Sequence, residues 1–112
     1  MPGALQAGDL NRRITVQRAT LAANGFNEAI ETWSTYAVLN AKKADATAGE
    51  SYRAAEVGAE ISCRFTVRWS PLTADIDARD RVLFGGQTYN VTGVRDVGVN
   101  QWREIDAVAR TP

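Results

Sequence analysis

Apolar and polar residues alternate over several short stretches of this chain, which is the pattern of half-buried β-strands. In "ISCRFTVRW", residues 61–69, the apolar side chains take every odd position, whereas Ser, Arg and Thr take the even ones. Pro71 follows, and proline ends a strand because it has no amide hydrogen to donate. We therefore predict a strand here, with Cys63 as a small buried hydrophobe in phase with Phe65.

The N-terminal third predicts a hairpin. "RRITVQRA" places Ile14 and Val16 on one face, and Asn24-Gly25 then forms a hairpin signal because both residues tolerate a positive φ. The return strand is expected over about residues 30–44. Its alternation is imperfect, which predicts a bulge or a twist.

The stretch "RVLFGGQTYNV", residues 81–91, sets Gly85-Gly86 between two alternating runs. A phosphate cradle would need G-x-G-x-x-G or G-x-x-x-x-G-K-[ST] leading into a helix. A strand follows here instead, without a lysine, so the glycines predict a two-residue hairpin turn. We expect strands over 81–84 and about 87–94, a turn at 95–100 and a last strand over about 101–108.

One segment, "TAGESYRAAEVGAE", is typical of a helix. Thr47 and Glu50 have the spacing of a capping box, and Gly58 lies where a C-terminal cap is expected. The helix should span about residues 48–57. Its apolar face is small, so we expect it to be stabilised only modestly by its own core and to pack against another subunit.

Six strand segments and one helical insertion predict a mainly β fold, a small antiparallel β-barrel or sandwich with the short helix between the second and third strands. The length of 112 residues is that of one domain. We expect this domain to cover residues 1–112, with an N-terminal arm at 1–10 and a helix-containing insertion at 45–59.

Composition narrows the function. Thirteen Lys plus Arg balance thirteen Asp plus Glu, so no general affinity for nucleic acid or anionic membranes is expected. A chain without net charge also has little electrostatic repulsion between its copies, which favours a protein that works within an assembly. The longest uncharged stretch, residues 82–94, is shorter than the about 18 apolar residues of a membrane span. The N-terminus lacks the pattern of a secretory signal, so we expect the chain to stay on the cytoplasmic side.

Catalytic and metal chemistry is not predicted. Cys63 is the only cysteine and there is no histidine, which excludes a Cys/His zinc site, an intrachain disulfide and a histidine-activated nucleophile within one chain. We therefore expect no enzyme and no cofactor. The acidic run "DIDARD" lacks the Gly and Glu that a calcium-binding EF-hand loop needs, because Asp80 and Gly86 occupy those positions. It predicts a solvated connection in which Asp75, Asp77 and Asp80 act as turn formers.

Arginines and tryptophans leave two further hypotheses. Arg64, Thr66 and Arg68 share the polar face of one strand, with Arg79 and Arg81 nearby in sequence, and could form a basic stripe for nucleic acid. The neighbouring aromatic residues point to the opposite face, so a solvated or subunit-facing surface is favoured. The tryptophans lie in strand-like stretches, which predicts core packing rather than a ligand platform. They are Trp33, Trp69 and Trp102.

The order of these segments resembles the phage head–tail joining family, the adaptor and head-closure (stopper) proteins of tailed phages and phage-like gene transfer particles. The resemblance covers almost the whole chain, in "GDLNRRITVQR", "NGFNEAIETWSTYAVLNAKKA", "FTVRWSPLTADIDARDRVLFGGQTYNV" and "REIDAVA". The most recognisable signature is Asp80-Arg81-Val82 followed by Gly86 and Tyr89. Asn40 departs from the pattern, since many relatives carry an aromatic residue there.

The resemblance implies a structural ring protein at the virion head–tail interface, without catalysis. Copies of the chain are expected to form a six- or twelve-fold ring on the portal axis, with the portal or an adaptor above and the tail terminator or tail tube below. Double-stranded DNA would pass through the lumen without sequence-specific contacts, and no membrane is involved. The expected location is a virion or phage-like particle that assembles in the bacterial host cytoplasm.

In some relatives the segment between the second and third strands faces the channel and helps to close it. Transferred here, that segment is residues 42–60, whose charges sum to minus one, a sign that suits a DNA conduit. The candidate channel-facing residues are Lys42, Lys43, Asp45, Thr47, Glu50, Arg53 and Glu56. The candidate subunit-interface charges are Arg64, Arg68 and Glu60, and across a ring the arginines would pair with Asp45, Glu50, Glu56 or Glu60 of a neighbour.

Two other readings stay open. Within virions, the chain could be a tail-completion or terminator-like protein at the upper end of the tail. From a different class, an OB-like or SH3-like barrel that binds nucleic acid fits the same strand pattern. An enzyme is the third and most distant class.

Overall fold

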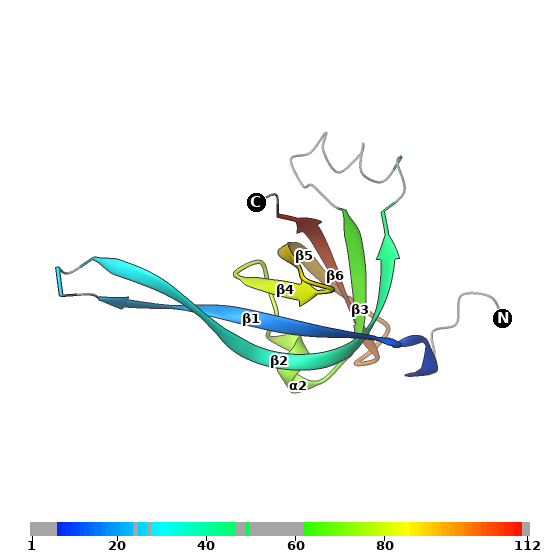
Figure 1. The fold of residues 1–112 in the computed structure, drawn as a ribbon. Helices are drawn as coiled ribbons and strands as arrows, with labels where there is room; N and C mark the ends of the chain where they lie inside the picture. The colour runs from blue at the N-terminus through cyan, green and yellow to red at the C-terminus, as the bar shows by residue number, and fades with distance from the viewer. Residues whose placement is uncertain (1–6, 24, 27, 47–48, 50–61, 111–112) are drawn as a thin grey trace.

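The protein is a closed six-stranded antiparallel β-barrel with one short helix (Figure 1). The computed structural model describes residues 7–23, 25, 26, 28–46, 49 and 62–110. The strands follow one another around the barrel in the order β1-β2-β3-β6-β5-β4. The elements are the 3-10 helix η1 (Ala7–Asp9), β1 (Arg12–Ala23), β2 (Ala29–Asp45), β3 (Cys63–Arg68), the helix α2 (Pro71–Ala74), β4 (Asp80–Phe84), β5 (Gln87–Val97) and β6 (Trp102–Ala109). This architecture confirms the predicted mainly β fold.

The barrel interior is the hydrophobic core, and the predicted inward phases fill it. Ile14 and Val16 of β1 are fully buried, as are Phe65 and Val67 of β3. The ring of Phe65 makes edge-on contacts with two rings from other strands, Phe84 of β4 and Tyr89 of β5. The centroid distances are 6.0 Å to Phe84 and 5.4 Å to Tyr89. Cys63 is 1% exposed, as predicted, and burial raises the pKa of its thiol to about 11. Val82, Ile105, Ala41, Ala107 and Ile76 are also buried in this core.

Strands β1 and β2 are longer than the barrel is tall. Their pairing runs from Arg12↔Ala41 to Ala23↔Ala29, yet β1 pairs with β4 only as far as Arg18, and β2 pairs with β3 only from Ala41 onward. Residues 19–35 therefore form a two-stranded ribbon that projects from the barrel, drawn in blue and cyan at the left of Figure 1. The ribbon contributes to a longest dimension of 58 Å against 32 and 26 Å across.

A β-bulge lies where the ribbon leaves the barrel. Val16 pairs with Ala37 and Gln17 with Thr35, so Tyr36 is the extra residue of β2. This confirms the predicted irregularity of the return strand, and a bulge increases the local twist of the two strands. A second irregularity lies in β5, between Val91 and Gly93, and β5 continues to Val97, beyond its predicted end.

Both hairpins predicted from glycine-containing turns are present. Gly85 and Gly86 have φ values of 59° and 78°, which confirms the two-residue turn between β4 and β5. Strands β1 and β2 pair as far as Ala23↔Ala29, which confirms the predicted hairpin. Asn24 lies outside the described residues.

The short helix of the described residues is α2, which lies where a polar connection was predicted. Ser70 caps it: the Ser70 hydroxyl accepts from the Thr73 amide at 3.1 Å, and the Thr73 hydroxyl accepts from the Ser70 amide at 2.8 Å. Pro71 occupies the first turn, where its missing amide hydrogen costs nothing. The predicted helix at 48–57, with Thr47, Glu50 and Gly58, lies outside the described residues except for Gly49.

Candidate functional site

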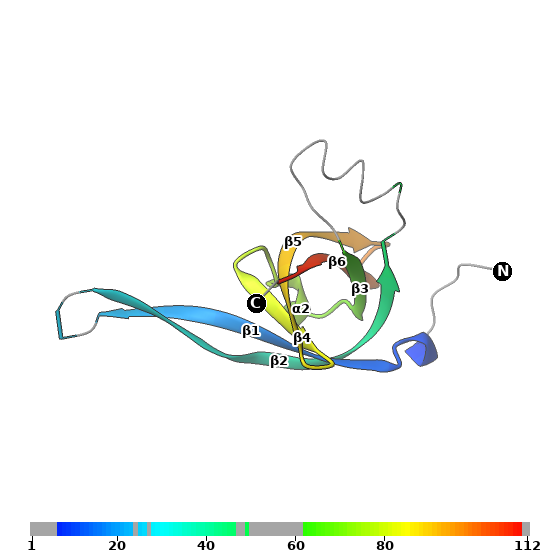
Figure 2. The ribbon, with the colours of Figure 1, turned by 45° about the horizontal axis from the view of Figure 1, so that its top comes forward.

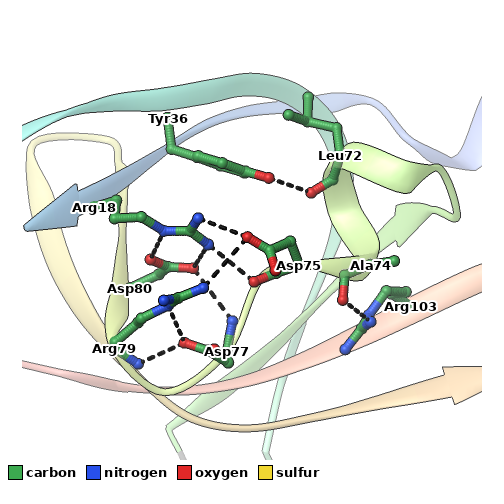
Figure 3. A network of polar contacts seen from close by, with 9 residues as sticks. All are labelled: Arg18, Tyr36, Leu72, Ala74, Asp75, Asp77, Arg79, Asp80 and Arg103. Atoms are coloured by element: carbon green, nitrogen blue, oxygen red, sulfur yellow. Dashed lines mark hydrogen bonds and ion pairs between the residues drawn. The ribbon is translucent and has the colours of Figure 1, made fainter.

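A charged cluster fixes the ribbon to the barrel at the point where β1 emerges (Figure 3). Arg18 follows Ile14 and Val16 in the inward phase of β1, which turns its guanidinium across the end of the barrel. Its Nε and Nη2 donate to the two carboxylate oxygens of Asp80 at 2.8 and 2.9 Å. Its Nη1 donates to the carboxylate of Asp75 at 2.7 Å and its Nη2 also to the Asp75 carbonyl at 2.9 Å.

Asp80 is the buried centre of this cluster, with a fully buried side chain. Besides Arg18, the backbone amide of Asp77 donates to its carboxylate at 3.2 Å. A buried carboxylate is tolerated only when donors and an opposite charge compensate it, and Asp80 has both. The predicted solvated connection is therefore wrong for Asp80, because its partner Arg18 lies 62 residues away and sequence spacing could not reveal the pair.

The exposed part of the cluster extends through Asp75, Asp77 and Arg79. Hydrogen bonds and the charge of Arg18 hold the pKa of Asp75 below its ordinary value, and the same contacts, with Asp80 first, raise the pKa of Arg18. Arg79 reaches Asp75 at 3.3 Å and Asp77 at 3.1 Å. Asp75 and Asp77 remain more than half exposed, so for these two the predicted solvated connection is confirmed.

Tyr36, the bulge residue, connects the ribbon to α2. Its ring lies under the guanidinium of Arg18, 4.1 Å from centroid to Cζ, and its hydroxyl donates to the Leu72 carbonyl at 2.7 Å. On the other side of α2, Arg103 donates to the Ala74 carbonyl at 2.6 Å. Arg18 and Tyr36 are absent from the sequence-based site residues. The available signal for Arg18 was a charged residue that continues an apolar phase after Ile14 and Val16.

The outer face of the ribbon base has its own contact. Arg81 donates from Nε to the side-chain oxygen of Gln17 at 2.7 Å and lies 4.1 Å over the Trp33 ring. Burial, followed by the charge of Arg110, lowers the pKa of Arg81. Among the family-signature residues, Asp80 and Arg81 thus secure the ribbon on its two faces, Gly86 forms the turn and Tyr89 packs on Phe65. We call the set Arg18, Tyr36, Asp75, Asp77, Arg79, Asp80 and Arg81 the junction.

The three tryptophans lie on the surface of the barrel and ribbon, each only partly buried, so the predicted core packing is wrong. Trp33 and Trp102 fall on the outward phase of their strands. Arginines cover them there: Arg81 covers Trp33, and Arg68 lies 5.8 Å from the Trp102 centroid. A flat aromatic ring stacks well beneath a guanidinium, so partial exposure is stable at these positions.

A groove runs over the outer face of β2, β3 and β6. It consists of two adjoining hollows of about 390 and about 420 Å³ that share Gln101 and Trp102. We call it the Trp102 groove. It is lined by Lys42, Ala44, Arg64, Thr66, Arg68, Trp69, Val97, Asn100, Gln101, Trp102 and Glu104.

The predicted basic stripe is not one surface. Arg64 and Arg68 line the Trp102 groove, whereas Arg79 and Arg81 belong to the junction. Arg64 donates to Asp106 of the adjacent strand at 2.7 Å, and Thr66 is only 9% exposed, so the polar face is partly covered.

The predicted channel-facing residues are described only in part. Lys43 pairs with Asp45 at 2.6 Å, whereas Lys42 points to the opposite face of β2 and lines the Trp102 groove. The remaining residues of that set, and one interface residue, lie outside the described residues; they are Thr47, Glu50, Arg53, Glu56 and Glu60.

Asn40, the departure from the family pattern, is exposed and lines a separate hollow of about 320 Å³ beside Leu39 and Arg68.

Across the part of the chain that the structure describes, no group of three or more His, Cys, Asp or Glu side chains is placed to hold a metal ion. None of the helices among those residues is long and apolar enough to cross a membrane.

Comparisons with known proteins agree with this architecture. A model of the family described as "Phage head completion protein" matches residues 5–110. No curated protein sequence matches significantly. A protein of Shigella flexneri 2a, known from its solution structure, has a similar fold with a TM-score of 0.72 and 24% identity, over 94% of this chain and 96% of that one. A chain in the virion of a native gene transfer agent particle has a TM-score of 0.61 and 18% identity, over 87% of this chain and 91% of that one.

Proposed function

This chain belongs to the phage head completion protein family, and from that premise we propose that it forms a ring at the virion head–tail interface. It is a structural protein of the virion rather than an enzyme. In this proposal the ring connects the portal, or an adaptor, to the tail and helps to retain packaged DNA.

One observation of the structure carries the proposal: the ribbon is fixed to the barrel at its base and exposes apolar side chains beyond it. The junction holds its base through a buried charge pair, while Leu21 and Phe26 beyond the barrel are 73% and 84% exposed. A two-stranded ribbon alone is marginally stable in water. An arm that is fixed at the base and apolar toward the tip suits a protein that is completed by contacts in an assembly.

The channel and interface roles belong to this proposal as well. The channel-facing segment is residues 42–60, with Lys42, Lys43 and Asp45 at its start, at the end of β2. Arg64 and Arg68 on β3 are proposed as interface charges. Both lie on the outward face of the strand, where Arg68 is exposed and Arg64 is partly buried beside Asp106.

Mass measurement tests the joining function. The purified chain is measured alone, with portal protein, and with tail terminator or tail tube protein, by native mass spectrometry. Rings that join at least one of these components are expected. A chain that joins neither would refute the proposal, and salt-sensitive binding to oligonucleotides would favour the nucleic-acid-binding barrel instead.

DNA retention is tested separately in particles. Replacing residues 47–58 with a Gly/Ser linker of equal length should give particles that assemble but lose DNA, measured as the fraction of filled heads. Thr92→Ser, at an exposed position outside the groove, the ribbon and the junction, serves as the control. Unchanged DNA retention would refute the gating role.

A further inference from the structure

The two faces of the ribbon differ in chemistry. Directly opposite residues of an antiparallel pair share a face, so the pairs Ala19↔Trp33, Leu21↔Glu31 and Ala23↔Ala29 lie on one side. We call this side the Leu21 face. The pairs Thr20↔Thr32 and Ala22↔Ile30 lie on the other side, which is richer in hydroxyl groups.

The Leu21 face has the form of a contact surface. Leu21 is 73% exposed at its centre, and the alanines around it leave room for a partner to approach closely. Phe26, in the turn at the tip of the ribbon, adds a second exposed apolar side chain with 84% exposure. Exposed apolar groups gathered on a projecting arm are typical of a protein–protein contact.

The Trp102 groove lies at the far end of the barrel from the ribbon. The register Arg12↔Ala41, Ala41↔Val67 and Arg68↔Trp102 places the groove near the start of β1, whereas the ribbon leaves at Arg18. Figures 1 and 2 show the ribbon and the turn between β5 and β6 on opposite sides of the barrel. Since the junction fixes the ribbon in this direction, the ribbon of one chain can reach only the groove of another.

Charge makes the two surfaces complementary. Residues 19–35 contain two carboxylates, Glu28 and Glu31, and no lysine or arginine. The groove is lined by Lys42, Arg64 and Arg68 and by one carboxylate, Glu104; Arg64 is already paired with Asp106, so Lys42 and Arg68 supply the positive charge for a partner. Within the described part of the chain, no acidic side chain lies within ion-pair distance of Lys42 or Arg68. The apolar part of the groove is Trp102 with Val97, beside Val99, which is 88% exposed.

We propose that the Leu21 face and Phe26 of one copy dock in the Trp102 groove of the next copy. In this contact Leu21 and Phe26 pack against Trp102 and Val97, and Glu31 pairs with Arg68 or Lys42. The contact is heterologous, because it joins two different surfaces, and repetition through a closing rotation forms a ring. The inference rests on the proposed ring function and names the contact that builds the ring.

Leu21→Ser and Ile30→Ser form a matched pair for the test, since both remove an exposed apolar side chain from the same ribbon but from opposite faces. Ring formation is measured by sedimentation of the full chain, alone and with portal protein. Leu21→Ser should raise the concentration needed for half-assembly by about 10- to 100-fold, as loss of a central apolar contact does. Ile30→Ser should change it by less than about threefold. An equal effect of the two variants would overturn the proposal.

Charge-reversal variants test whether the Trp102 groove is the surface that the ribbon binds. Glu31→Arg alone and Arg68→Glu alone should each weaken assembly, whereas the double variant, or a mixture of the two single variants, should regain it because opposite charges meet again. Loss of portal or tail binding in Glu31→Arg, with unchanged rings, would show that the ribbon binds another virion protein and would overturn the self-contact. Wild-type rings that neither variant weakens would overturn this inference alone. A wild type that joins neither portal nor tail would refute the proposed function itself.

Discussion

The barrel and the ribbon are made from the same two strands, yet their side chains meet opposite surroundings. In the first half of β1, Ile14 and Val16 are fully buried by the strands that close the barrel. In the second half, Thr20 and Ala22 continue the same phase yet are exposed, because no third strand pairs with that part. The two strands therefore continue without a break from the buried barrel into the exposed ribbon, and the junction lies where one passes into the other.

The comparison shows two ways to hold a strand in place. The barrel is stabilised by apolar burial around Phe65, which needs no specific partner. The ribbon base is held by directional contacts, the charge pair of Arg18 with Asp80 and the hydrogen bond of Tyr36 to Leu72. Directional contacts set an angle as well as a position, which a projecting arm requires if it is to meet a partner.

Two phenylalanines give the largest expected difference between the regions. Phe65→Ala should lower the free energy of unfolding by about 3–5 kcal/mol, because it leaves a cavity in the barrel core. Phe26→Ala, at the ribbon tip, should change the free energy of unfolding by less than about 0.5 kcal/mol. Urea unfolding of the isolated chain measures both. Similar losses for the two variants would mean that the ribbon is part of the cooperative core.

Two aspartates of the junction separate buried from exposed charge. Asp80→Asn should lower the free energy of unfolding by about 2–4 kcal/mol, because it leaves the Arg18 guanidinium without its buried carboxylate. Asp77→Asn changes a carboxylate that is 53% exposed and should cost less than about 1 kcal/mol. Thermal unfolding measures both variants. Hydrogen exchange should also show faster exchange of the ribbon amides in Asp80→Asn, and unchanged exchange would contradict a positioning role.

The buried thiol of Cys63, in the barrel, makes the free energy of unfolding fall at alkaline pH. The folded thiol has a pKa of about 11 against an ordinary value of 9.0, so the unfolded chain releases its proton first as the pH rises. The stability is therefore intact below about pH 9 and falls between about pH 9 and pH 11, by about 1–3 kcal/mol. Urea unfolding at several pH values measures this fall. It should be smaller in Cys63→Ala by the same amount, and equal falls in both chains would exclude the thiol.

Two glycines give the smallest difference. Gly86→Ala should cost about 1 kcal/mol, because Gly86 has a φ of 78° that an L side chain adopts only with strain, although space for a methyl group is open. Gly25→Ala meets open space and no positive φ, so it should change the free energy of unfolding by less than about 0.5 kcal/mol. Thermal unfolding of both variants checks this, and a larger loss for Gly25→Ala would place the strained turn at the ribbon tip.

The residues of the candidate site could be predicted from the sequence only where neighbouring residues identify them. The family signature Asp80, Arg81, Gly86 and Tyr89 was identified from its order, and the structure gives each residue a structural contact. The partner of Asp80 was not predictable, since Arg18 is joined to it only after the barrel closes. The surface position of the tryptophans was missed for other reasons: Trp69 follows the last residue of β3, and Trp33 and Trp102 lie on the outward phase of their strands.

By itself, the sequence determined the strands, the Gly85-Gly86 turn, the irregular second strand and the inward phase of Ile14, Val16, Phe65 and Val67. These features depend on side-chain alternation and on local φ preferences, which act over a few residues. Only the tertiary structure decided that β1 and β2 outrun the barrel, that Asp80 is buried against Arg18, and that the Trp102 groove lies opposite the ribbon. The physical reason is that strand closure brings together residues far apart in sequence, and burial depends on which strands cover each segment.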